Sequence, residues 1–162
     1  MQGHGELTFV CGKIYKGQFY ANKIEGRGLM LYTNGDCYDG EWEEDLRQGT
    51  GMAKYAKGIK YYGEWLNNRR HGQGVMNYEN GDTYEGMFKF SLEEGKGTMK
   101  YANGDEFKGN WLHGNIDGRG VFTFANGDRY SGKFKANLEE GKGVMTYANG
   151  DVYNGGWFRG LR

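Results

Sequence analysis

The sequence predicts an all-β protein: an elongated, single-layer antiparallel sheet, like a solenoid, made of seven stacked 23-residue β-hairpins. Three signals predict this fold, namely an aromatic–x–Gly–x–aromatic motif, a Gly–x–Gly motif and a turn motif, each repeating every 23 residues. Self-similarity at such a period is typical of repeat architectures, in which each unit buries its apolar side chains by stacking on its neighbours.

The aromatic motif begins at seven positions that are 23 residues apart. It reads YKGQF from Tyr15, YDGEW from Tyr38, YYGEW from Tyr61, YEGMF from Tyr84, FKGNW from Phe107, YSGKF from Tyr130 and YNGGW from Tyr153. Gly–x–Gly keeps the same interval, from Gly3 and Gly5 to Gly141 and Gly143. The turn motif lies between the two and usually reads Tyr-x-Asn-Gly-Asp, as at Tyr32. Asn-Gly between alternating strands is a strong hairpin signal.

Each unit is therefore expected to run strand, tight turn, strand, for example 26–32, 34–36 and 37–42. A link of six residues, such as 43–48, would return the chain to the next Gly–x–Gly. A single array then fills residues 1–162, with hairpins at 3–19, 26–42, 49–65, 72–88, 95–111, 118–134 and 141–157.

Strand geometry predicts that the rings and the glycines share one face, because residues two apart point to the same side. Tyr38, Gly40 and Trp42 form one such set, and Gly26, Gly28, Met30 and Tyr32 form the other. We expect a glycine opposite a ring to leave a slot in which the ring lies flat along the sheet. One layer can then bury aromatic area without a second sheet.

Composition limits the kind of core and the kind of partner. Only 27 residues are Leu, Ile, Val or Phe, while aromatic residues reach 16%, so Tyr, Trp, Phe and Met must supply the core. The 21 basic and 21 acidic residues balance, which gives no general attraction to nucleic acid. The N-terminus has no basic start and no apolar run of a signal peptide, and Cys11 and Cys37 fit no disulfide framework. We therefore expect a cytoplasmic protein with free thiols.

The repeat resembles the MORN (membrane occupation and recognition nexus) unit, which runs close to YEGEWKNGKRHGKGVLTYANGD. Residues 61–82, YYGEWLNNRRHGQGVMNYENGD, are nearly that consensus, and the resemblance covers essentially the whole chain. It implies an elongated, twisted, single-layer antiparallel sheet with a curved, aromatic-lined groove. Members of this family are mostly scaffolds at the cytoskeleton, cilia and membrane junctions. Their proposed ligands are partner proteins, in some cases a helix laid along the groove, and phosphoinositides.

These observations favour a non-catalytic scaffold or adaptor that binds a segment of a partner protein along its aromatic groove. The setting expected from the resemblance is a cytoskeletal, ciliary or membrane-junction assembly. Each ring is also a candidate for the core of the sheet. The candidate groove residues are Met30, Tyr38, Trp42, Tyr61, Trp65, Met76, Tyr84, Met99, Trp111, Phe122, Tyr130 and Met145. Substitutions such as Met76→Glu are expected to abolish binding and to leave the fold intact.

Two alternatives stay open beside this reading. The first is a membrane or phosphoinositide tether, with Arg69 and Arg70 as a weak candidate for lipid contact. It is not favoured, because the links are acidic overall and segments 91–94 and 137–140 are acidic where the family is basic. The second is a regulatory repeat module of a larger enzyme. Self-association through the edge strands at the two ends of the array is a further expectation.

No catalytic, cofactor-binding or metal-binding residues are expected. The Asp residues of the turn motif (Asp36, Asp82, Asp105, Asp128 and Asp151) lie one hairpin apart, too far to share a calcium ion. They are interpreted as turn residues. The three histidines occupy different repeats, and Gly–x–Gly lacks the helix and the Lys-Ser/Thr of a phosphate loop.

Overall fold

The computed structural model describes residues 2–162, and it shows β-strands and turns and no helix in that part of the chain. The chain divides into two compact units, Met1–Glu79 and Asn80–Arg162. They are called the N-terminal and the C-terminal unit below, and each is described by itself. No helix of the described chain has the length and apolar character needed to span a membrane.

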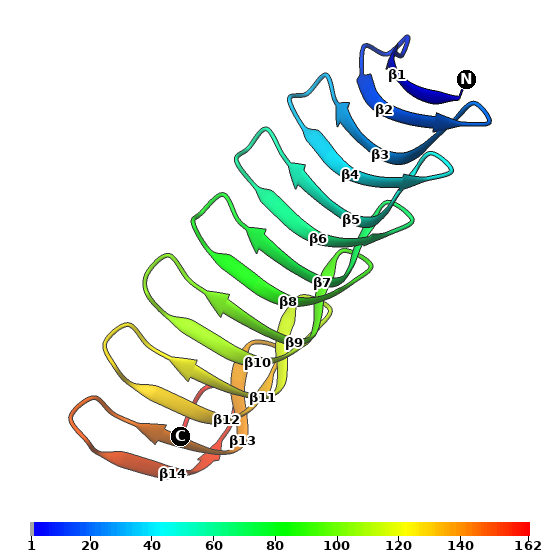
Figure 1. Cartoon of the computed structure of the whole chain (residues 1–162). Helices are drawn as coiled ribbons and strands as arrows, with labels where there is room; N and C mark the ends of the chain where they lie inside the picture. Colours follow the sequence, from blue (N-terminus) through cyan, green and yellow to red (C-terminus); the bar gives the residue numbers. More distant parts are fainter. Residues whose placement is uncertain (1) are drawn as a thin grey trace. The chain divides into compact units, whose positions relative to one another are not determined.

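Both units are antiparallel meanders, in which strands that follow each other in sequence pair in the sheet (Figure 1). The strands of the N-terminal unit are β1 (Gly3–Thr8), β2 (Ile14–Tyr20), β3 (Lys23–Leu31), β4 (Cys37–Glu43), β5 (Leu46–Lys54), β6 (Lys60–Leu66) and β7 (Arg69–Asn77). Those of the C-terminal unit are β8 (Thr83–Lys89), β9 (Leu92–Lys100), β10 (Glu106–Leu112), β11 (Asn115–Thr123), β12 (Arg129–Lys135), β13 (Leu138–Thr146) and β14 (Val152–Trp157). The all-β class and the antiparallel hairpin repeats expected from the sequence are confirmed.

The register of each hairpin places a glycine opposite a ring or opposite another glycine. In β3 and β4, Gly26 pairs with Trp42, Gly28 with Gly40, and Met30 with Tyr38. The same register recurs in β5 and β6, where Gly49 pairs with Trp65 and Gly51 with Gly63. The expected placement of glycines opposite rings on one face is therefore confirmed.

The turn that contains Asn-Gly has three residues between its closing pair. The Tyr32 N–H donates to Asp36 O (3.0 Å), and the Gly35 N–H donates to Tyr32 O (3.1 Å). Gly35 has φ of 87°, which a glycine adopts without the steric cost of a β carbon. This is a type I turn followed by a left-handed glycine, the common three-residue hairpin connection.

The six-residue links expected from the sequence are wrong. After Glu43 the chain turns in two residues, Glu44 (φ 49°) and Asp45 (φ 67°), and β5 begins at Leu46. Two consecutive left-handed residues define a type I′ turn, whose twist matches that of the flanking strands. The link residues on either side of the turn therefore belong to the strands, and β3, β5 and the equivalent strands start three residues earlier than expected.

These tight turns are fixed by hydrogen bonds to the preceding repeat. The Ile24 N–H donates to Asp45 Oδ1 (2.8 Å), the Asp45 N–H donates to Ile24 O (3.0 Å), and the Glu44 N–H donates to Glu25 Oε2 (3.0 Å). The same set recurs in the C-terminal unit, where Asn137 and Ile116 exchange bonds in the same way. Contacts between repeats thus hold non-glycine residues in the left-handed conformation.

A β-bulge interrupts the pairing between the repeats. Gly40 pairs with Gly51, but Trp42 pairs with Arg47, so β5 carries two more residues than β4 over the same stretch. Equivalent shifts follow Gly17, Gly63, Gly86, Gly109 and Gly132. Bulges bend a strand and raise its twist, in agreement with the bent strands of Figure 1.

Candidate functional site

Each tyrosine of the aromatic motif except Tyr153 lies flat across two glycines. A β carbon added to Gly40 would lie 2.5 Å from the hydroxyl oxygen of Tyr38, and one added to Gly51 would lie 2.5 Å from Cζ of the same ring. The Tyr38 hydroxyl donates to Glu41 O, 3.0 Å away, and this bond holds the ring along the strand. The slot expected from the sequence is therefore present, and it is formed by one glycine of the same strand and one of the next.

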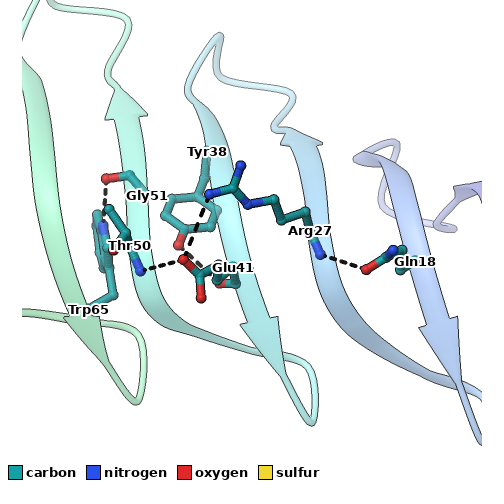
Figure 2. A network of polar contacts seen from close by, with 7 residues as sticks. All are labelled: Gln18, Arg27, Tyr38, Glu41, Thr50, Gly51 and Trp65. Carbon is teal, nitrogen blue, oxygen red and sulfur yellow. Dashed lines mark hydrogen bonds and ion pairs between the residues drawn. The ribbon is translucent and has the colours of Figure 1, made fainter.

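Within each unit, the rings of successive repeats pack edge to face. Tyr38 contacts Trp42 at 5.0 Å between ring centroids with planes at 88°, and it contacts Trp65 of the next repeat at 5.1 Å and 81°. The Trp65 indole N–H donates to Gly51 O at 3.1 Å (Figure 2). The C-terminal unit has the same series, from Phe88 and Tyr84 to Trp157 and Tyr153. This geometry is the favourable one for aromatic pairs.

These rings form the core. All candidate groove residues except Phe122 are buried, and Tyr38, Tyr61, Tyr84 and Tyr130 have exposed fractions of 0%. Phe122 is half-buried. Whether any of the twelve contacts a partner stays a prediction, but the buried ones offer little area to a ligand.

A second set of aromatic residues stays half-exposed on the same face. These residues, with Phe122, are called the aromatic row: Phe9, Tyr32, Tyr55 and Tyr78 in the N-terminal unit, and Tyr101, Phe122, Phe124 and Tyr147 in the C-terminal unit. Phe122 stacks on Tyr101 (5.8 Å, 28°) and contacts Phe124 (4.6 Å). The sequence pattern places Tyr32 on the face of the rings, but neither Tyr32 nor its equivalents are among the candidate groove residues. Their position two residues after Met30 and its equivalents was the available sign that they extend that face.

The opposite face, called the outer face, carries polar contacts that cross from strand to strand. In the N-terminal unit, the Arg27 N–H donates to Gln18 Oε1 (3.0 Å) and the Thr50 N–H donates to Glu41 Oε1 (3.2 Å) (Figure 2). The Gln73 N–H donates to Glu64 Oε1 at 2.8 Å in the same way. The bulges expose these backbone amides, and a side chain of the preceding strand supplies the acceptor.

Arg69 and Arg70 lie on β7 and not in a link. Adjacent residues of a strand point to opposite faces, and the structure agrees. Arg69 is exposed, whereas Arg70 is half-buried on the face that carries the stacked rings, called the ring face below. The Arg70 guanidinium lies 5.7 Å from the Tyr61 ring centre and donates to Met76 Sδ at 3.6 Å. The two arginines therefore form no shared basic spot, and lipid contact through them stays an untested prediction.

The Asp residues of the turn motif hold turns together. The Asp36 N–H donates to Asn34 Oδ1 (3.1 Å), and Asp36 Oδ1 accepts the Ala56 N–H of the next turn (2.8 Å). Asp82, Asp105 and Asp128 accept the equivalent amides of Ala102, Ala125 and Ala148. Their interpretation as turn residues is confirmed. Cys11 and Cys37 are free thiols, and no group of metal-ligating side chains forms within residues 2–162.

Burial also changes the acidity of the core tyrosines. It raises the pKa of Tyr15 to about 12, and Glu25 adds to this rise, while the bond to Gln18 O partly opposes it. Burial raises the pKa of Tyr38, Tyr61 and Tyr84 as well. These phenols are therefore neutral at physiological pH and serve as hydrogen-bond donors.

Among solved structures, this fold is shared by the TCP domain of SAS-4 (dCPAP) of Drosophila melanogaster in complex with a proline-rich motif of Ana2 (dSTIL). The two chains are 16% identical with a TM-score of 0.54, and the match covers 93% of this chain and 88% of that one. The G-box domain of the microcephaly protein CPAP matches with 13% identity and a TM-score of 0.38, over 96% of this chain and 100% of that chain. The TCP10 domain of Danio rerio CPAP matches with 15% identity and a TM-score of 0.32, over 93% and 82%.

No curated protein matches the chain significantly. The MORN repeat family matches six consecutive segments, each in register with the aromatic motif: residues 15–37, 38–60, 61–83, 84–106, 107–129 and 130–152. These segments contain the stacked Tyr and Trp rings, the paired glycines and the turn aspartates described above. The chain therefore belongs to the MORN repeat family.

Proposed function

We propose that this chain is a non-catalytic scaffold that binds a segment of a partner protein on its ring face. The observation that carries the proposal is the aromatic row. In the C-terminal unit, Phe122 contacts both Tyr101 and Phe124, and all three remain half-exposed on that face. The buried rings beneath give this row a rigid base. Amphipathic aromatic side chains on a rigid base are typical of protein-binding surfaces.

Two further observations support the proposal. The TCP domain of SAS-4, which has this fold, is in complex with a proline-rich motif, so a sheet of this kind can present a surface to a peptide. Several carboxylates of this chain have structural partners: Asp36 and Asp45 bind backbone amides in turns, and Glu41 and Glu64 do so at bulges.

The partner segment we propose is extended or helical, and it crosses the strands from one repeat to the next. A cytoplasmic, cytoskeletal or ciliary setting is the one that membership in this family favours. Self-association through the end strands and a lipid tether are competing outcomes that the following experiment would distinguish.

Affinity capture with the purified chain as bait tests the proposal when wild type is compared with the double variant Phe122→Ala and Phe124→Ala. Alanine is tolerated at the position of Phe122, because Ala53 occupies it in the N-terminal unit, where it is 2% exposed. The matched control is Val152→Ala, which removes an apolar side chain that is 63% exposed on the outer face of the same unit.

Proteins bound through the aromatic row should be lost with the double variant and kept with the control, while circular dichroism shows both variants folded. Binding that both variants keep in full would contradict the proposal. If the bait captures only further copies of the chain, self-association is favoured instead. If it captures only lipid vesicles, a lipid tether is favoured.

A further inference from the structure

The outer face of the C-terminal unit carries a set of cations that form no ion pair in the described chain, although Glu140, whose carboxylate accepts the Arg159 N–H, lies directly opposite Lys133. They are Lys96 on β9, Lys108 on β10, Arg119 on β11, Lys133 on β12 and Lys142 on β13. All five are exposed, and within residues 2–162 none of them forms an ion pair. On the same face of the N-terminal unit, by contrast, Lys16 pairs with Glu6 (3.1 Å) and Arg27 pairs with Glu41 (4.0 Å).

The two units differ in charge at the repeat position that Glu41 occupies in one and Lys133 in the other. Arg119 is directly opposite Lys133 across β11 and β12, as Arg27 is directly opposite Glu41 across β3 and β4. A like-charge pair in this position destabilises a sheet, whereas an opposite pair stabilises it. An anion bound from outside would relieve the repulsion between Arg119 and Lys133.

The same position supplies the acceptor for the bulge amides. In the N-terminal unit Gln18, Glu41 and Glu64 accept the N–H groups of Arg27, Thr50 and Gln73. Their equivalents in the C-terminal unit are Met87, Asn110 and Lys133. In the described chain, no side chain accepts the corresponding N–H groups of Lys96, Arg119 and Lys142.

The space that a carboxylate fills in the N-terminal unit is open in part of the C-terminal unit. A β carbon on Gly49 would meet the Glu41 carboxylate, with Oε2 at 2.5 Å. A β carbon on the equivalent Gly141 would have nothing within 4 Å, and one on Gly95 would meet only Met87, at 3.7 Å. Asn110 partly fills the third position, because a β carbon on Gly118 would lie 3.2 Å from its side chain.

We propose that the outer face of the C-terminal unit binds an acidic segment of a partner protein, whose Asp or Glu carboxylates take the places that Glu41 and Glu64 fill internally in the N-terminal unit. The best-formed position lies beside Gly141. There the carboxylate accepts the Lys142 N–H and lies between the charges of Lys133 and Lys142. Carboxylate is favoured over other anions because that group already occupies the equivalent positions in this chain.

The repeat spacing sets the pattern of the segment. Strands in a sheet lie about 4.8 Å apart, so the positions on β9, β11 and β13 are about 9.6 Å apart. Three residues of an extended chain span about 10 Å. An acidic residue at every third position of an extended segment would therefore reach successive positions.

This proposal is independent of the one for the aromatic row, since the two surfaces lie on opposite faces. Its test uses the intact chain and a synthetic peptide with glutamate at every third position, and the control peptide has glutamine in place of glutamate. Fluorescence anisotropy measures the affinity, and amide chemical shifts report the site. The glutamate peptide should bind and the glutamine peptide should not, and the affinity should fall at higher salt. Binding should change the chemical shift of the Lys142 amide.

Two variants that remove the same charge sharpen the test. Lys133→Gln places an acceptor like Gln18 beside Lys142, so the open position becomes filled internally. Lys133→Ala removes the charge and leaves the position open. We expect Lys133→Gln to weaken binding roughly tenfold more than Lys133→Ala, since a hydrogen bond to a charged group is lost in addition to the Coulomb attraction. Lys54→Gln, on the outer face of the N-terminal unit, should leave affinity unchanged.

Equal weakening by Lys133→Gln and Lys133→Ala would overturn the proposal, because it would show diffuse charge attraction and no carboxylate position. The proposal also fails if anionic vesicles or single-stranded oligonucleotides bind this face and the glutamate peptide does not. If the aromatic-row double variant loses its protein partner while the peptide result is negative, only the present inference falls.

Discussion

Tyr38 and Trp42 lie on the same face of β4, with ring centroids 5.0 Å apart and ring planes at 88°. This single relationship is the unit from which the core is built, because Tyr38 repeats the contact with Trp65 of the next hairpin at 5.1 Å. The glycines let it form, since a side chain at Gly40 or Gly51 would occupy the space of the Tyr38 ring.

Gly51→Ala should destabilise the N-terminal unit by about 3 kcal/mol, the upper part of the range for overpacked cores. The added methyl group would overlap the buried Tyr38 ring, which cannot move without breaking its contacts with Trp42 and Trp65. Urea unfolding followed by tryptophan fluorescence measures the change. Gly156→Ala is the matched control, because a β carbon there has nothing within 4 Å, and its stability should stay close to wild type.

Met76→Glu should unfold the N-terminal unit instead of only removing binding, which corrects the expectation from the sequence. Met76 is 5% exposed, so the substitution would bury a carboxylate at a cost of about 3 kcal/mol or more. Met52→Glu makes the same change at a side chain that is 43% exposed on the outer face. Thermal unfolding should separate the two variants clearly, and equal melting temperatures would show that Met76 is not part of the core.

The core tyrosines should make the fold sensitive to alkali. The pKa of Tyr15 is raised from 10.0 to about 12 in the folded chain, so the unfolded state loses its proton first as pH rises. The stability that this group contributes is fully present below pH 10 and is lost as pH rises toward about 12. Tyrosinate absorbance and circular dichroism, recorded against pH, check this.

Tyr15→Phe supplies the control for the alkaline transition. Phe107 occupies the equivalent position in the C-terminal unit and is 0% exposed, so phenylalanine fits the slot. The variant should lose stability less steeply between pH 10 and about 12, because one titrating phenol is gone. An unchanged slope would mean that Tyr15 ionises as readily in the folded chain as in the unfolded one.

Asn137 should tolerate glycine better than alanine. Its side chain accepts the Ile116 N–H (2.7 Å), and its φ is 70°. Asn137→Gly keeps the left-handed conformation and loses the hydrogen bond, at a cost of about 1 kcal/mol. Asn137→Ala also strains the backbone, which adds about 1 kcal/mol. Denaturant midpoints rank the variants, and an alanine variant as stable as the glycine variant would contradict the role of the turn.

Much of the ring face could be predicted from the sequence. The 23-residue period and the two-residue alternation of a strand place Tyr38, Gly40 and Trp42 on one side, and the structure confirms this with Gly28 opposite Gly40. The link was mispredicted for a physical reason. Glu44 and Asp45 have no local preference strong enough to signal a type I′ turn, and their conformation depends on bonds to Ile24 and Glu25, 19 to 21 residues away.

The all-β class, the hairpin repeat and the face on which the rings gather can be predicted from the sequence, because these depend on residue spacing alone. Which of those rings are accessible depends instead on the packing of neighbouring strands and repeats. Tyr38 is fully buried because a neighbouring strand supplies Gly51 and a neighbouring repeat supplies Trp65, and spacing within one repeat carries no information on that packing. The bulges likewise form only where two strands pair. The backbone N–H groups that donate to Glu41 and Glu64, and the equivalent N–H of Lys142, could therefore not be identified before the strands were aligned.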